Sequence, residues 1–165
     1  PAPARWQDGA MSTDAASERR SSKFLLAVDD PPECKQALRF ATHRARNVGG
    51  GVTLLHVIEP AATQEWVAVA KMMQQEAREE AERLMQNLAT QVHEESGIMP
   101  ELVIRDGRAK DELLQLIGED PSIRILVLGA GTGSDGPGPL VTALAGQMSG
   151  SLSIPITLVA TSWLA

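Results

Sequence analysis

Aromatic residues are scarce in this chain: they make up 3% of it, and there is no tyrosine. Any hydrophobic core must therefore consist of aliphatic side chains, which the 43% hydrophobic content can supply. Cysteine is scarcer still, and the single Cys34 has no partner in the chain with which to form a disulfide. We therefore expect a reducing compartment and a cytoplasmic protein.

Other absences limit the partners and the chemistry. No apolar run reaches the roughly 20 residues that a membrane-spanning helix needs. The formal net charge of −6 disfavours general affinity for nucleic acid or for an anionic membrane. No Cys/His spacing indicates a metal site, and His56, inside an apolar run, is predicted to be a hydrogen-bonded core histidine. We expect a binding protein without catalytic residues, metal, nucleic-acid partner or membrane partner.

The first segment, Pro1 to Ser22, is polar and rich in Ala, Ser, Asp and Arg. It contains too few large apolar residues to form a core, so we predict a mobile N-terminal arm. The remainder, residues 23–165, has the length of one domain.

Beyond this arm, apolar runs alternate with segments whose apolar residues recur at three- and four-residue steps. The runs predict strands at Lys23 to Val28, Val52 to Ile58, Pro100 to Arg105, Ile123 to Leu128 and Ile156 to Ala160. The periodic segments predict helices at Glu33 to Val48, Gln64 to Ser96, Ala109 to Glu119 and Pro139 to about Ser149. In the second helix, one face is expected to bury a stripe of apolar residues: Val67, Ala70, Met73, Ala77, Ala81, Leu84, Leu88 and Val92. This alternation predicts an α/β three-layer sandwich with a five-stranded parallel sheet.

We expect the strand order 3-2-1-4-5, in which the first and fourth strands lie side by side where the winding reverses. Ligands of such sheets bind outside the carboxyl ends of the strands at this point. The order places Asp29 and the segment after Gly129 on either side of one crevice. It also predicts that the helix beginning at Ala109 starts far from that crevice.

Five glycines follow the fourth predicted strand within ten residues, at Gly129, Gly131, Gly133, Gly136 and Gly138. A glycine loop before a helix can present backbone N–H groups to a phosphate. From Ile125 to the end, however, the chain has no Lys or Arg, and Asp135 adds a negative charge. Backbone donors, the weak helix dipole and Mg²⁺ would have to hold a phosphate. A tight connection would also use these glycines, and we favour this interpretation while the phosphate loop stays open as the alternative.

Four segments in this order resemble the universal stress protein family, from about Lys23 to Val159. They are KFLLAVDD, VTLLHVIEP, the segment around Gly107, and ILVLG with IPITLV. The resemblance implies the adenine-nucleotide alpha-hydrolase-like (Rossmann-like) fold and a role in the stress response. It also implies a homodimer joined through the last strand, Ile156 to Val159, and an unidentified protein partner. That strand is an edge in the expected sheet and would need covering.

The ATP-binding branch of the family contacts the nucleoside through an Asp that ends the first strand and a Val that follows a His in the second. Here these positions are Asp29, next to Ala27 and Val28 in the strand, and Val57. The branch holds phosphates with G-x-x-G, nine residues, then G and Ser or Thr. Counted from Gly129, one of these four positions matches, since the others are Thr132, Thr142 and Ala143.

The resemblance thus implies these candidate nucleotide-binding residues: Ala27, Asp29, Val57, Gly129, Gly131, Thr132, Gly133, Thr142 and Ala143. Because the phosphate motif is altered, we expect a dimeric binding module that works without nucleotide. The alternative is an ATP- or AMP-binding stress sensor, with Mg²⁺, that uses the crevice between Asp29 and the Gly129 loop.

Overall fold

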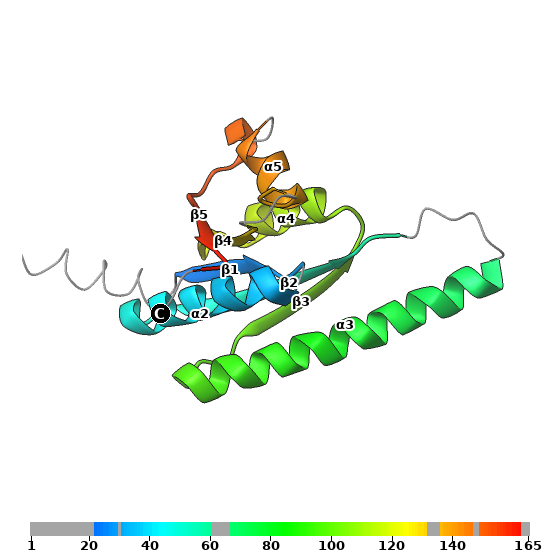
Figure 1. Cartoon of the computed structure of the whole chain (residues 1–165), viewed down its shortest axis with the longest axis horizontal. Coiled ribbons are helices and arrows are strands. Elements are labelled where there is room, and N and C mark those ends of the chain that lie inside the picture. Colours follow the sequence, from blue (N-terminus) through cyan, green and yellow to red (C-terminus); the bar gives the residue numbers. More distant parts are fainter. Residues whose placement is uncertain (1–21, 30, 61–66, 132–135, 147–148, 163–165) are drawn as a thin grey trace, which may run out of the picture.

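The computed structural model of the chain describes residues 22–29, 31–60, 67–131, 136–146 and 149–162. The fold is a sheet of five parallel strands between two layers of helices, as predicted (Figure 1). Apart from Ser22, the predicted arm lies outside the described residues. The division of the chain into arm and domain therefore stays a prediction.

The sheet confirms the predicted strand order, β3-β2-β1-β4-β5. The strands are β1 (Lys23–Ala27), β2 (Gly51–Ile58), β3 (Glu101–Asp106), β4 (Ile123–Ala130) and β5 (Ile156–Ala160). Successive side chains of a strand point to opposite faces, and in the central strand β1 both Leu25 and Leu26 are fully buried. Burial on both faces explains why this strand reads as an unbroken apolar run.

Two helices cover each face of the sheet (Figure 1). One face carries α2 (Pro31–Val48) and α3 (Val67–Ser96), and the other carries α4 (Ala109–Glu119) and α5 (Pro139–Ala145). A short 3-10 turn, η1 (Ser149–Ser151), precedes β5. The sheet divides the core, so that Leu26 packs with α2 and α3 and Leu25 with α4 and α5.

The last helix is shorter than predicted. It ends at Ala145 and not near Ser149. Gly146 closes it, because its N–H donates to the carbonyl of Thr142 at 3.1 Å. Glycine is a poor helix former, and the sequence prediction gave this residue too little weight.

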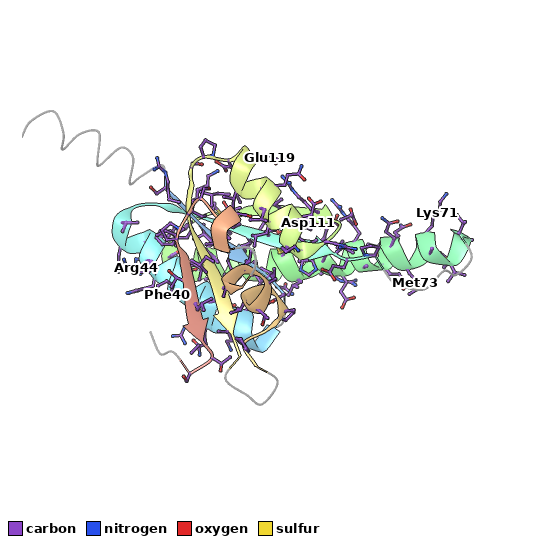
Figure 2. All side chains as sticks on the ribbon, turned by 90° about the horizontal axis from the view of Figure 1, so that it is seen from above. Phe40, Arg44, Lys71, Met73, Asp111 and Glu119 are labelled. Carbon is purple, nitrogen blue, oxygen red and sulfur yellow. The ribbon has the colours of Figure 1, made fainter. Side chains whose placement is uncertain are left out.

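The predicted apolar stripe of α3 is buried only in part. Of its residues, Ala81 and Val92 are buried, whereas Val67 is 73% and Met73 46% exposed. Met85, which the predicted stripe left out, is buried as well. The reason is visible in both views: α3 extends well past the sheet, and Met73 lies toward its free end (Figures 1 and 2). Periodicity indicates which residues share a helix face, but it does not indicate how far the sheet beneath them reaches.

Lys23, the first residue of β1, links three parts of the fold. Its Nζ atom lies 2.8 Å from Oε2 of Glu101 at the start of β3 and 2.8 Å from Oδ2 of Asp120 after α4. The hydrogen bond from Lys23, followed by one from the Ser122 hydroxyl, lowers the pKa of Asp120. The same pairing, with Asp120 and then Glu101, raises the pKa of Lys23.

Stability should therefore depend on the charge of Asp120. A carboxyl group whose pKa is lowered by folding stabilises the fold above its unfolded pKa, about 3.9, and loses this contribution as the pH falls through its folded value. We expect Asp120→Asn to lower the free energy of unfolding by about 1 kcal/mol at pH 7, and by less at about pH 3, which lies below the unfolded pKa. Urea unfolding at both pH values measures this, with the exposed Glu94→Gln as control. An equal loss at both would contradict the account.

The partial burial of α3 predicts opposite outcomes for two methionines of this helix. Met85 is fully buried and Met72 is 66% exposed. We expect Met85→Ala to cost about 2–5 kcal/mol because it leaves a cavity, and Met72→Ala to change stability by less than about 0.5 kcal/mol. Urea unfolding followed by circular dichroism compares the two. A cost at Met72 similar to that at Met85 would show that the free end of α3 is covered in solution.

Candidate functional site

A pocket of about 280 Å³ opens at the carboxyl ends of β1 and β2, where α4 and α5 begin. Its lining consists of Ala27, Val28, Asp29, Leu55, His56, Val57, Glu59, Ala109, Leu113, Pro139 and Leu140. Most of these side chains are apolar, and Asp29, His56 and Glu59 supply the polar groups. An apolar pocket with a few convergent polar groups is the usual form of a small-molecule site.

Hydrogen bonds from β2 fix the end of β1. The N–H of Val28 donates a hydrogen bond to the carbonyl of Leu55 at 2.7 Å. The carbonyl of Val28 accepts a hydrogen bond from Nδ1 of His56 at 2.9 Å. A carbonyl can only accept, so Nδ1 carries the proton and Nε2 is the acceptor of the neutral ring. These bonds hold Asp29, the next residue, at the pocket. His56 is hydrogen-bonded as predicted, but it is half-buried and lines the pocket instead of lying in the core.

The other end of the lining is fixed to β2 as well. The N–H of Gly107 donates to the carbonyl of Ile58 at 3.1 Å, and the N–H of Ala109 donates to Oε1 of Glu59 at 3.1 Å. The φ angle of Gly107 is 144°, which favours glycine. The Glu59 carboxylate therefore caps the N-terminus of α4, where N–H groups lack helical partners and the helix dipole is positive.

Three of the predicted site residues lie together. Ala27, Asp29 and Val57 all line the pocket. The other described candidates are not in its lining: Gly129 lies within β4, Gly131 follows β4, and Thr142 and Ala143 lie in α5. Thr132 and Gly133 lie outside the described residues.

The predicted phosphate loop uses some of its donors internally. The N–H of Gly131 donates to the carbonyl of Pro137 at 3.3 Å. The Thr142 hydroxyl donates to the carbonyl of Gly138 at 2.9 Å, one helical turn earlier. In this structure these two groups therefore close the loop and the first turn of α5, and they do not point donors into the pocket.

The sequence analysis missed the contribution of Glu59 and of α4. The expectation that the helix starting at Ala109 begins far from the site is wrong, because α4 and α5 pack on the same face of the sheet and Ala109 and Leu113 line the pocket. A usable signal was present: Glu59 directly follows the second strand, as Asp29 follows the first. The rule that placed Asp29 at the site also applies to Glu59.

Cys34 is buried at the start of α2, and burial raises the pKa of its thiol to about 12, with a smaller contribution from the charge of Asp29. A thiol with this pKa is protonated at neutral pH and unreactive. Over the described part of the chain, no three His, Cys, Asp or Glu residues gather in a way that could hold a metal ion. None of the described helices is long and apolar enough to cross a membrane.

The fold is shared with solved universal stress proteins. UspA from Lactobacillus plantarum is 18% identical, with a TM-score of 0.71 over 85% of this chain and 98% of that one. A family protein from Arabidopsis thaliana with AMP bound is 19% identical, with a TM-score of 0.57 over 84% and 91%. The protein from Archaeoglobus fulgidus in complex with dAMP is 20% identical, with a TM-score of 0.53 over 83% and 96%.

At these identities the likeness shows the fold alone, and a comparison with curated proteins gives no significant match. The sequence profile of the universal stress protein family, however, matches residues 21–159. This match spans every strand and helix described above except the last residue of β5. On this ground, the chain belongs to the universal stress protein family.

Proposed function

We propose that this chain is a binding module of the stress response whose pocket takes the nucleoside part of an adenine nucleotide. One observation carries the proposal: Asp29 and Val57, the two positions that the resemblance connects with the nucleoside, line a single pocket. Asp29 follows β1 and Val57 lies near the end of β2, 28 residues further along the chain. Hydrogen bonds of Val28 with Leu55 and His56 hold the ends of β1 and β2 together.

The chemistry of the lining suits a nucleoside. A carboxylate such as that of Asp29 can accept hydrogen bonds from ribose hydroxyls or from an exocyclic amine. Leu55, Leu113 and Leu140 supply apolar surface for a flat base. The volume of about 280 Å³ is close to the lower end of the roughly 300–1,000 Å³ of known ligand pockets. It therefore favours a small ligand.

Charge favours AMP or adenosine over ATP. Asp29 and Glu59 are acidic, and none of the described residues that line the pocket is Lys or Arg. A triphosphate would bring about three to four further negative charges, which would require cations such as Mg²⁺. The two solved relatives named above with AMP or dAMP hold nucleoside monophosphates, which supports this choice.

Binding, not turnover, is the activity that we propose. Within the described lining there is no Ser, Thr, Cys or Lys side chain to act as a nucleophile. Nδ1 of His56 is hydrogen-bonded to the Val28 carbonyl, so this nitrogen is already used within the protein. A cytoplasmic location, expected from the single cysteine, is part of the same proposal.

Calorimetric titration with adenosine, AMP and ATP tests the proposal. We expect adenosine and AMP to bind, and Asp29→Ala to weaken AMP binding at least about tenfold, since a hydrogen bond to a charged group contributes about 1.5–3 kcal/mol. The control is Asp106→Ala, at the carboxyl end of the edge strand β3 and outside the lining. No heat with any of the three ligands at millimolar concentration would overturn the proposal.

A second candidate is a dimeric adaptor that needs no nucleotide, as the sequence analysis expected. One observation favours it: β5 is an edge strand, and its Leu158 is 48% exposed. An apolar edge strand readily pairs with another strand unless it is covered. Two copies joined through Ile156 to Val159 would cover it, and the paired surface would then bind an unidentified protein.

Sedimentation analysis tests this adaptor. We expect the wild type to be a dimer and Leu158→Lys to be a monomer, because two like charges would meet across the pairing axis. Met99→Lys is the matched control, since Met99 is 75% exposed and lies two residues before β3, the strand at the opposite edge of the sheet. A monomeric wild type, or a Leu158→Lys variant that stays dimeric, would rule out assembly through β5.

A further inference from the structure

Glu59 lines the pocket and also caps the N-terminus of α4. Its Oε1 atom accepts a hydrogen bond from the N–H of Ala109, 50 residues further along the chain, at 3.1 Å. Arg108, the N-cap residue of α4, makes no side-chain capping bond. The charged cap of this helix is therefore supplied by a strand end that also lines the pocket.

This position gives the Glu59 carboxylate an electrostatic role. The N-terminus of a helix attracts anions, through both its dipole and its unpaired N–H groups. Here a fixed carboxylate of the protein already occupies the N-terminus of α4. Together with Asp29, it makes the polar part of the lining acidic.

None of the described residues that line the pocket is a Lys or an Arg. Arg108 and Lys110 flank Ala109 in the sequence, but neither lines the pocket, and Arg108 is exposed. On the α5 side, the N–H of Gly131 and the hydroxyl of Thr142 donate within their own segment. The described lining thus offers an incoming phosphate two carboxylates and no cationic side chain.

We propose that Glu59 is a specificity-determining residue that selects against phosphate on the ligand. This inference rests on the proposed function, since it concerns the same pocket. The negative charge of Glu59 repels each added phosphate, so it lowers the affinity for AMP and for ATP relative to that for the uncharged nucleoside. The order of affinity is therefore adenosine, then AMP, then ATP.

The test is the isosteric variant Glu59→Gln, which removes the charge but keeps a carbonyl oxygen to accept from Ala109. The matched control is Glu94→Gln, which changes the net charge equally at an exposed position of α3. Calorimetry gives the affinities of adenosine, AMP and ATP for the three proteins at 20 and 300 mM salt, and a thermal melt reports whether each variant is folded.

We expect Glu59→Gln to raise the affinity for AMP, relative to that for adenosine, about tenfold over the wild type, a change of the size expected for one charge at close range. The gain should shrink in high salt, because salt screens charges. Glu94→Gln should show neither effect. AMP binding that appears only in Glu59→Gln would also support the inference.

Two results would overturn the inference in distinguishable ways. If adenosine binds the wild type but the preference between adenosine and AMP is the same in Glu59→Gln, Glu59 does not select against phosphate and the proposed function stands. If no ligand binds any of the three folded proteins, the proposed function fails and the inference fails with it.

Discussion

The carboxyl end of β2 is the point on which the pocket depends. Backbone and side-chain bonds from this end reach the end of β1 through Val28 and the start of α4 through Gly107 and Ala109. Two segments far apart in the sequence are thereby fixed against one strand. Walls that are held by such bonds cost less entropy to order when a ligand binds.

One of these bonds gives the Glu59 carboxylate two roles, as a cap of α4 and as a negative charge in the pocket lining. Glu59 satisfies an N–H of α4 that would otherwise need another partner, and this use brings a carboxylate into the lining. The stabilising cap and the acidic pocket are therefore one feature. A chain that binds phosphates strongly would need a cation or spare donors here to offset it, and the described lining has no Lys or Arg.

Much of the fold followed from residue patterns, since unbroken apolar runs and helical stripes reflect burial directly. The strand order was predicted from the fold class and is confirmed. The extent of burial along α3 was not predictable, because it depends on where the sheet ends and not on the helix itself. Asp29 was predicted from its place at a strand end and from the family resemblance, Val57 from the resemblance alone, and the two line one pocket. The strand-end rule would also have placed Glu59 there, but its capping of α4 depends on a contact 50 residues away and could not be predicted.

The most direct test of this account is to map nucleotide contacts residue by residue, with ¹⁵N-labelled protein titrated with AMP and followed by amide chemical shifts. The account predicts the largest shifts at Asp29, Val57, Glu59 and Ala109, on the three elements that converge at the pocket. Shifts confined to β5, or no shifts at millimolar AMP, would contradict it.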